Sequence, residues 1–313
     1  MTVSTFDTLL DGRSLTVARQ RLFGIGFICL AAMCFAALDS SAKWLGRSGL
    51  PVLEVAFIRY LGAFLVIAVV MNPWRTPSAW RTDKLWLQTL RSLALLGSTI
   101  FNFMALRTMQ LADVMAINFV VPFLVALLAG PILGEKVAPR QWIAIALGFA
   151  GVLVVTRPGS NPIDAGLLWT LGGVLCNAYY AISTRQLSTV DSAASMLLIS
   201  AGQATLLLAP SQVAIWVWPQ SHLQWIAMGC IGVFATISHF FVIRAYTLAP
   251  APVVAPFTYT QMIWTSLAGY ILFTDVPGFY TVLGAAIVVA SGLYLLVAEA
   301  RQGNRIASRV MRD

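Results

Sequence analysis

Long apolar runs dominate this chain and restrict what it can fold into. An α-helix needs roughly 20 apolar residues to cross a bilayer, and the sequence offers ten such runs. The loops between them are short, so we expect no separate soluble domain. The expected membrane spans are residues 22–45, 51–71, 85–107, 111–132, 138–156, 164–187, 192–216, 222–246, 252–273 and 277–298.

The composition agrees with lipid as the main solvent of this chain. Apolar residues make up 59% of its 313 residues, and charged residues make up only 10%. A soluble domain carries about 25% charged residues, and no soluble fold of this size has an interior for so much apolar surface. The sequence therefore predicts an all-α integral membrane protein with ten transmembrane helices.

The 20 basic residues and the net charge of +8 predict how the chain is oriented. Most of them lie on the same side of the membrane as the N-terminus. The opposite ends of the spans hold Lys43, Arg47, Arg107 and Arg157. This bias follows the positive-inside rule and predicts a multi-pass membrane protein with both termini in the cytoplasm. The basic charge indicates contact with anionic lipid and not with nucleic acid. The inner set includes Arg13, Arg19, Arg21, Arg75, Arg81, Lys84, Lys136, Arg140, Arg185, Arg244, Arg301, Arg305, Arg309 and Arg312.

Catalytic and metal-binding patterns are missing from the sequence. Its four cysteines all lie inside apolar runs, where we interpret them as small core residues, and it has only two histidines. No HExxH or GxSxG sequence and no paired acid set is present. We therefore expect no enzyme activity, no metal and no cofactor. The sequence does not determine the oligomeric state, for which we favour a monomer.

Two proline-interrupted spans suggest that the chain contains two related halves. Residues 105–136 cross an apolar run around Pro122, and residues 244–275 repeat the pattern with Pro252 and Pro256. Each half has five spans, an odd number, so the second copy is expected to enter the membrane upside down. The predicted organisation is a cytoplasmic tail (1–21), a first five-helix repeat (22–156), a linker (157–163), a second repeat (164–298) and a cytoplasmic tail (299–313).

Polar and aromatic residues recur at helical spacing in five of the spans. Each stripe alone is typical of hydrogen bonding between helices, but together they predict a central cavity. We expect one set of side chains to wall an apolar group and another to orient a polar end. The first set is Phe101, Tyr180, Phe240, Tyr259 and Trp264, and the second is Asn102, Asn118, Asn177, Thr236, His239 and Gln261.

Three charged residues within the first two spans are expected to form supporting ion pairs. Asp39 and Lys43 are four residues apart and can neutralise each other on one helical face. Arg59 lies deeper, where a charge requires a partner on another helix. The three prolines are expected to free backbone carbonyls that face the cavity.

The chain resembles the drug/metabolite transporter superfamily, and within it the paired EamA-domain transporters of bacteria. The resemblance covers about residues 22–298. It implies two inverted five-helix repeats, a central cavity and export by alternating access, with the aromatic amino acid exporters as the nearest likeness. In the second half, Thr274-Asp275 stands where the first half has Gly134-Glu135. The matching residues are Phe57-Ile58-Arg59-Tyr60, Ala105-Leu106, Ala112, Ala116, Pro122, Gly134-Glu135 and Gly151.

The leading functional prediction is therefore an exporter of aromatic or other hydrophobic amino acids. The candidate faces contain no basic pair for a phosphate, and their neutral, aromatic character favours amino acids over sugar phosphates. Efflux of lipophilic drugs is the alternative within transport. A membrane-embedded scaffold or a lipid-processing enzyme is the alternative of another class.

Overall fold

The computed structural model describes residues 17–71, 80–133, 139–157, 164–187, 190–249 and 254–310, and these ranges contain helices and no strand. Part of the linker, Pro252 and most of the N-terminal tail lie outside them. The helices are α2 (Val17–Arg47), α3 (Val52–Met71), α4 (Leu85–Thr108), α5 (Leu111–Asn118), α6 (Val121–Leu133), α7 (Pro139–Thr156), α8 (Ala165–Leu187), α9 (Ala193–Ile215), α10 (His222–Leu248), η3 (Ala255–Thr260), α12 (Gln261–Phe273) and α13 (Phe279–Val310).

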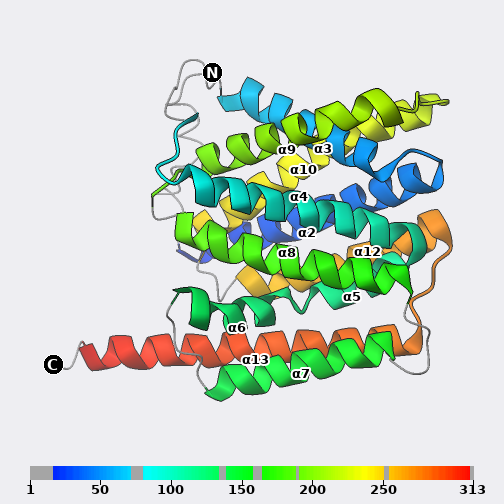
Figure 1. Cartoon of the computed structure of the whole chain (residues 1–313). Coiled ribbons are helices and arrows are strands. Elements are labelled where there is room, and N and C mark those ends of the chain that lie inside the picture. The colour runs from blue at the N-terminus through cyan, green and yellow to red at the C-terminus, as the bar shows by residue number, and fades with distance from the viewer. Residues whose placement is uncertain are drawn as a thin grey trace.

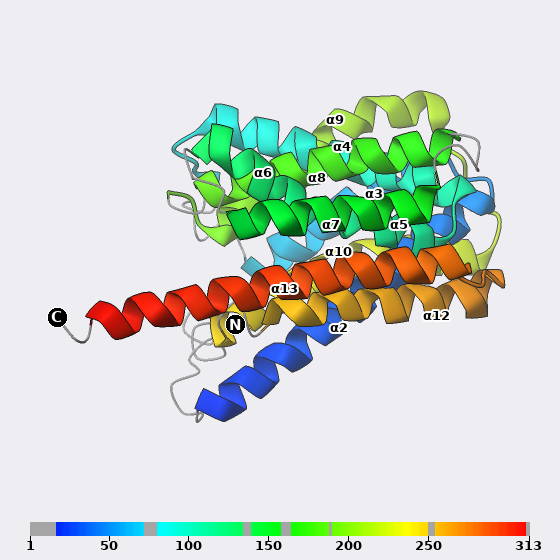
Figure 2. The same ribbon diagram turned by 90° about the horizontal axis from the view of Figure 1, so that it is seen from below.

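The helices form one elongated bundle (Figure 1). Helices α7 and α13 pack together along one edge, and α3 packs on α9 towards the opposite edge. Between these edges, α2 packs on α10 and α4 packs on α8. Helix α2 begins and α13 finishes at the same end of the bundle, which we name the terminal end; the other is the distal end (Figure 2).

The helices agree with the expected spans, with differences at some ends. Six of them are long and apolar enough to cross a membrane, namely α2, α3, α4, α8, α9 and α10, and the apolar segments Leu111–Val125, Trp142–Thr156 and Phe279–Tyr294 are shorter. The fourth expected span is divided into α5 and α6, and the ninth into η3 and α12. Helix α13 continues to Val310, beyond the expected end at 298, because alanine, glutamate and arginine in this stretch favour a helix in water as well.

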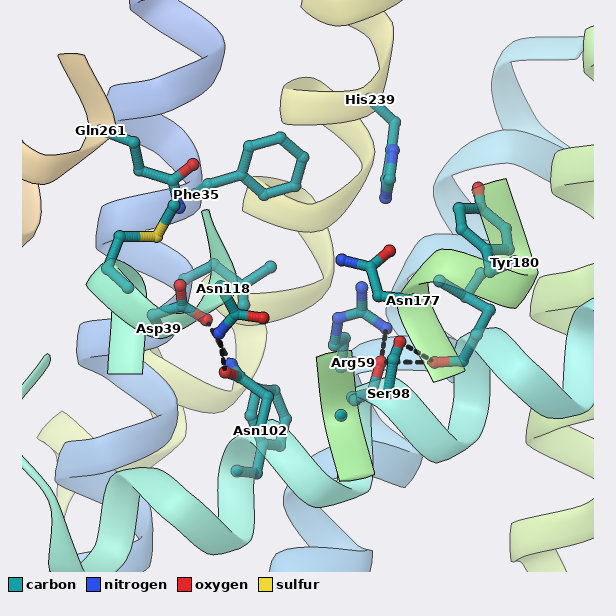
Figure 3. Close-up of a pocket in the computed structure, with 16 residues that line it drawn as sticks. Phe35, Asp39, Arg59, Ser98, Asn102, Asn118, Asn177, Tyr180, His239 and Gln261 are labelled. Atoms are coloured by element: carbon teal, nitrogen blue, oxygen red, sulfur yellow. Dashed lines mark hydrogen bonds between the residues drawn. The ribbon is translucent and has the colours of Figure 1, made fainter. Parts of the chain in front are cut away.

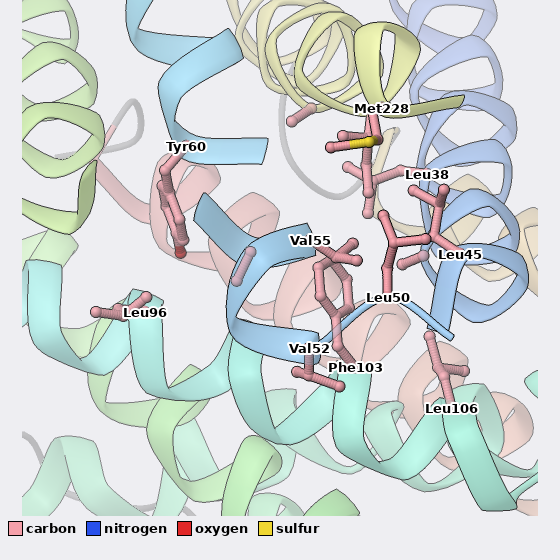
Figure 4. Packing of buried hydrophobic residues seen from close by; sticks show 14 of the residues in the cluster. Leu38, Leu45, Leu50, Val52, Val55, Tyr60, Leu96, Phe103, Leu106 and Met228 are labelled. Atoms are coloured by element: carbon pink, nitrogen blue, oxygen red, sulfur yellow. The ribbon is translucent and has the colours of Figure 1, made fainter. Parts of the chain in front are cut away.

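The largest apolar cluster fills the distal part of the bundle (Figure 4). Leu45 and Leu50 flank the turn between α2 and α3, Leu106 ends α4 and Met228 lies near the start of α10; all four are at most 3% exposed. A second cluster joins α5, α6, α7 and α13 through Phe123 and its neighbours. These two clusters fix the helices that surround the site described below.

Helices α3 and α10 approach each other closely where two glycines meet. A Cβ atom added at Gly232 would lie 2.6 Å from the Cα atom of Gly62. At Gly229, three residues earlier on α10, a Cβ atom would meet nothing within 4 Å. Packing therefore requires a glycine at position 232 but not at position 229.

We predict that Gly232→Ala destabilises the protein by about 1–3 kcal/mol, the usual effect of overpacking a close contact. The matched variant Gly229→Ala should be at least as stable as the wild type, since alanine favours the helix. Thermal unfolding of the purified protein in detergent measures both. Equal melting temperatures for the two variants would contradict the close approach.

A candidate substrate cavity between the helices

A cavity of about 280 Å³ opens in the middle of the bundle, where seven helices meet (Figure 3). Its wall combines carboxylate, guanidinium, amide, hydroxyl and aromatic groups. Helix α4 supplies five of the lining residues because its positions 95, 98, 99, 102 and 103 share one helical face. The lining consists of Phe35, Leu38, Asp39, Arg59, Leu95, Ser98, Thr99, Asn102, Phe103, Met115, Asn118, Gly173, Asn177, Tyr180, His239 and Gln261.

The structure brings six of the eleven predicted binding residues to this cavity. Asn177 and Tyr180 reach it from α8, together with Gly173 one turn earlier. The ring of His239 on α10 lies edge-on to Phe35, with centroids 5.3 Å apart. The six residues are Asn102, Asn118, Asn177, Tyr180, His239 and Gln261.

The other five predicted residues are not part of the lining. Phe101 stacks on Trp169 at 5.7 Å, and Tyr259 meets Phe119 edge-on at 5.0 Å. The hydroxyl of Thr236 donates to the Gly232 carbonyl at 3.0 Å, although the residue lines a small neighbouring pocket with Arg59 and His239. The remaining two residues are Phe240 and Trp264; Phe240 packs on Phe241, and the indole N–H of Trp264 is buried without a partner among the described residues.

Both broken spans place a polar side chain at the cavity. Asn118 is the last residue of α5, just before the interruption that precedes Pro122, and Gln261 is the first residue of α12, directly after the 3₁₀ turn that contains Pro256. Irregular backbone is tolerated at membrane depth where it lines a cavity. Pro122 and Pro256 therefore lie next to the helix ends that bring these two amides to the cavity, and Pro252 lies outside the described residues.

The predicted pair between Asp39 and Lys43 is wrong. The Lys43 Nζ atom instead lies 2.6 Å from Asp275 Oδ2 and donates to the Met109 carbonyl at 2.9 Å. Asp275 is in reach because Thr274 adopts a left-handed conformation, φ 58°, that turns the chain at the end of α12. Lys43 is fully buried, and this contact joins α2, the end of α4 and the end of α12 at the distal end.

Asp39 and Arg59 are consequently left facing the cavity. An Asp39 oxygen accepts a hydrogen bond from the Asn102 amide at 3.1 Å, and Asn102 in turn accepts one from Asn118 at 3.4 Å. Arg59 donates to the Thr99 hydroxyl at 3.0 Å. In the described part of the chain neither residue has an oppositely charged group within 4.0 Å, so the expectation of supporting ion pairs does not hold for them, and the lining is not neutral as expected.

A second buried arginine holds the wall of the cavity near the terminal end. Arg91 of α4 is 2% exposed. It donates to Thr184 at 2.7 Å, to Ser200 at 2.8 Å and to the Tyr180 hydroxyl at 3.2 Å. The sequence placed Arg91 within a span but gave no sign of these partners, because they come from α8 and α9. Arg91 thus fixes the position of Tyr180 at the cavity.

The residues predicted to bind substrate include none of the first helix, although the family resemblance implies that this helix lines the cavity. Phe35 and Asp39 of α2 are four residues apart and both line the cavity; this spacing on one face was the available signal. Among the described residues, no group of three or more His, Cys, Asp or Glu side chains could hold a metal ion.

This helical bundle, with apolar helices around a polar central cavity, has the architecture of a membrane transporter. The sequence profile described as the EamA-like transporter family matches residues 22–157 and again residues 164–298. The chain therefore belongs to the EamA-like transporter family, as its resemblance predicted, and is a multi-pass membrane protein.

Several bacterial transporters are similar to this chain over nearly their whole length. An S-adenosylmethionine uptake transporter of Rickettsia prowazekii is 25% identical over 89% of this chain and 94% of its own. Riboflavin transporters of Vibrio cholerae and Brucella anthropi are 26% and 28% identical, over 93% and 85% of this chain and 98% and 95% of their own. A solved crystal structure with a TM-score of 0.61 and 17% identity, covering 91% of this chain and 99% of that one, shares the fold.

We predict that Lys43→Met lowers the stability by about 3 kcal/mol, because removing one partner leaves a largely buried carboxylate unpaired. The double variant Lys43→Met/Asp275→Asn should recover most of this loss, since no charge is then left alone. Arg47→Met, one turn further along α2 at an exposed position, is the matched control. Thermal unfolding in detergent compares them, and a wild-type melting temperature for Lys43→Met would contradict the pairing.

Proposed function

We propose that this protein carries aromatic or other hydrophobic amino acids across the bacterial inner membrane by alternating access, in the direction of export. The observation that carries the proposal is the composition of the cavity wall. It combines amide and hydroxyl groups with the rings of Phe35, Phe103 and Tyr180. Such a wall suits a ligand with one strongly polar end and one apolar end.

The volume of the cavity favours a small ligand. At about 280 Å³ it lies at the lower limit of small-molecule sites, which range from roughly 300 to 1,000 Å³. A single amino acid fits this space better than a large ring system with a long polar chain. Size thus supports amino acids over riboflavin as the substrate.

The named relatives supply a second candidate. S-adenosylmethionine, the substrate in the name of the Rickettsia relative, carries the same α-amino and α-carboxylate groups as a free amino acid, whereas riboflavin carries neither. S-adenosylmethionine is about as large as riboflavin, so the cavity volume favours a smaller amino acid over both, and we keep S-adenosylmethionine as the second candidate substrate for its α-amino and α-carboxylate groups alone. That relative is named for uptake, and gradients of substrate and of any coupled ion set the direction of a secondary carrier, so export is tested separately below.

Membership of a transporter family favours transport over the alternative of a membrane-embedded scaffold or lipid-processing enzyme. Efflux of lipophilic amines remains the alternative within transport. Such amines would use Asp39 and leave the nearby Arg59 without a partner. An amino acid engages both charges, which is why we prefer it.

We propose further that residues 22–156 and 164–298 are inverted copies of one five-helix unit, with both tails in the cytoplasm. The family profile matches once in each half. The packing supports this proposal. In the two copies α2 corresponds to α8 and α4 corresponds to α10, and the contact of α2 with α10 has its counterpart in the contact of α8 with α4. Gly24 of α2 lies against Ala249, which directly follows α10, and the counterpart Gly166 of α8 lies against Met109, which directly follows α4.

Alternating access then requires that each end of the cavity opens in turn. In this structure the contact of Lys43 with Asp275 and the Met109 carbonyl joins three helices at the distal end. The bias of basic residues assigns this end to the periplasm. We propose that the contact keeps the periplasmic side closed and that it separates when substrate leaves.

We predict that proteoliposomes containing the protein transport labelled phenylalanine faster than threonine or lysine, and do not transport a sugar phosphate. S-adenosylmethionine and riboflavin are measured beside them, with the substrate loaded inside or outside to establish direction. Transport of the sugar phosphate alone would contradict the proposal, as would transport of riboflavin without any amino acid.

We predict that Asn177→Ala slows phenylalanine transport about fivefold, as expected for a lost hydrogen bond of about 1 kcal/mol. Leu175→Ala lies on the same helix at a position 59% exposed on the outer surface and should transport at the wild-type rate. Rates are compared at equal amounts of folded protein. An unchanged rate in Asn177→Ala would remove this amide from the binding site.

A further inference from the structure

The cavity contains two opposite charges, Asp39 and Arg59, neither of which forms an ion pair within 4.0 Å among the described residues. We infer that these charges bind the two ends of an α-amino acid, with the Asp39 carboxylate receiving the ammonium group and the Arg59 guanidinium receiving the carboxylate. The inference rests on the proposed function and deepens it, because it states which chemical feature every substrate must carry. Both side chains point into the cavity, with Asn118 between them in Figure 3.

Asp39 has room for a cationic ligand. Among the described residues, the Asn102 amide donates a hydrogen bond to one of its carboxylate oxygens at 3.1 Å. An ionised carboxylate accepts several hydrogen bonds, so most of its capacity remains open. The lysine one turn away on the same helix cannot take this place, because Lys43 is held by Asp275 at 2.6 Å.

Arg59 has matching capacity for an anion. It is 7% exposed; one terminal nitrogen donates to the Thr99 hydroxyl at 3.0 Å, and the guanidinium also forms a hydrogen bond with the Tyr60 side chain. Its Nε atom is buried without a partner among the described residues. The guanidinium has five N–H donors in a planar fork that fits a carboxylate, and the face of the fork rests on the Tyr60 ring at 4.6 Å, which leaves its edge for a ligand.

The neighbouring polar groups hold this pair of charges apart. Asn118 donates to Asn102 and also to the Val114 carbonyl, at 3.4 and 2.9 Å, so the amide that supports Asp39 is itself fixed. On the other side, Tyr60 and Thr99 share a hydrogen bond of 2.8 Å beneath Arg59. Arg91 is excluded as a competing cation, because its donors bind Thr184, Ser200, Tyr180 and the Met196 carbonyl.

These two charges favour a ligand that brings both opposite charges into the cavity. A bound ligand displaces water from these charges, and a charge away from water is unfavourable unless an opposite charge accompanies it. A zwitterion satisfies both groups at once without changing the net charge of the site. A molecule with only an ammonium group or only a carboxylate leaves one protein charge unmatched. The site should therefore select zwitterions over amines, acids and neutral ring systems.

The test measures the dissociation constants of matched ligands by isothermal titration in detergent. Phenylalanine is compared with phenylalaninamide, which lacks the carboxylate, and with N-acetylphenylalanine, which lacks the ammonium group. The wild type should bind phenylalanine at least tenfold more tightly than either analogue. S-adenosylmethionine and threonine complete the panel as α-amino acids with other side chains.

Two variants then assign each charge to its partner. Asp39→Asn should weaken phenylalanine binding at least tenfold and leave N-acetylphenylalanine nearly unchanged, and Arg59→Gln should weaken phenylalanine but leave phenylalaninamide nearly unchanged. A purely structural role would weaken all three ligands together. Asp83→Asn and Arg107→Gln, at exposed positions, are the control variants and should bind like the wild type.

The outcomes separate this inference from the proposed function. If phenylalanine binds but both analogues bind as tightly, the zwitterion site is wrong while amino acid transport stands. If each variant weakens all ligands equally, the assignment of Asp39 and Arg59 is wrong. If no α-amino acid of the panel binds the wild type, both proposals are overturned.

Discussion

The ion pair between Lys43 and Asp275 determines which charged side chains face the cavity. Lys43 is fully buried and reaches the far end of α12 and a carbonyl at the end of α4. If it turned back to Asp39 on its own helix, the cavity would contain one unmatched guanidinium. Because it does not, Asp39 and Arg59 both face the cavity, and the same contact that joins the distal ends of three helices also leaves a site with two opposite charges.

The sequence predicted the helices well because bilayer thickness imposes their length. Apolar runs of about twenty residues admit few other structures, and the resemblance to EamA-domain transporters is confirmed by the family match. The partners of charged side chains were harder to predict. Asp39 and Lys43 have the spacing of a local pair, but Asp275 is 232 residues from Lys43 in sequence. Nothing in the local sequence indicates that Lys43 pairs with Asp275 instead of Asp39.

For the cavity lining, too, the local sequence predicted some residues and tertiary packing decided others. Helical spacing identified Asn177 and Tyr180, but it could not decide the rotation of α4, on which Asn102 faces the cavity and the adjacent Phe101 stacks on Trp169. One residue corresponds to about 100° around a helix, and the sequence alone could not decide which of the two neighbours, Phe101 or Asn102, faces the cavity. The helix breaks were more informative, because each one ends or begins a helix at an amide that lines the cavity.

The central claim is that a water-accessible cavity that binds amino acids lies in the middle of the bundle. Cysteine labelling tests it most directly, in a protein whose Cys29, Cys34, Cys176 and Cys230 are replaced by alanine. Ser98→Cys, in the cavity wall, should react with a membrane-impermeant maleimide, since reaction requires a thiolate in water, and phenylalanine should slow the reaction. Leu93→Cys, on the same helix at an exposed apolar position, should not react. No reaction at position 98, or reaction that no amino acid slows, would contradict the account.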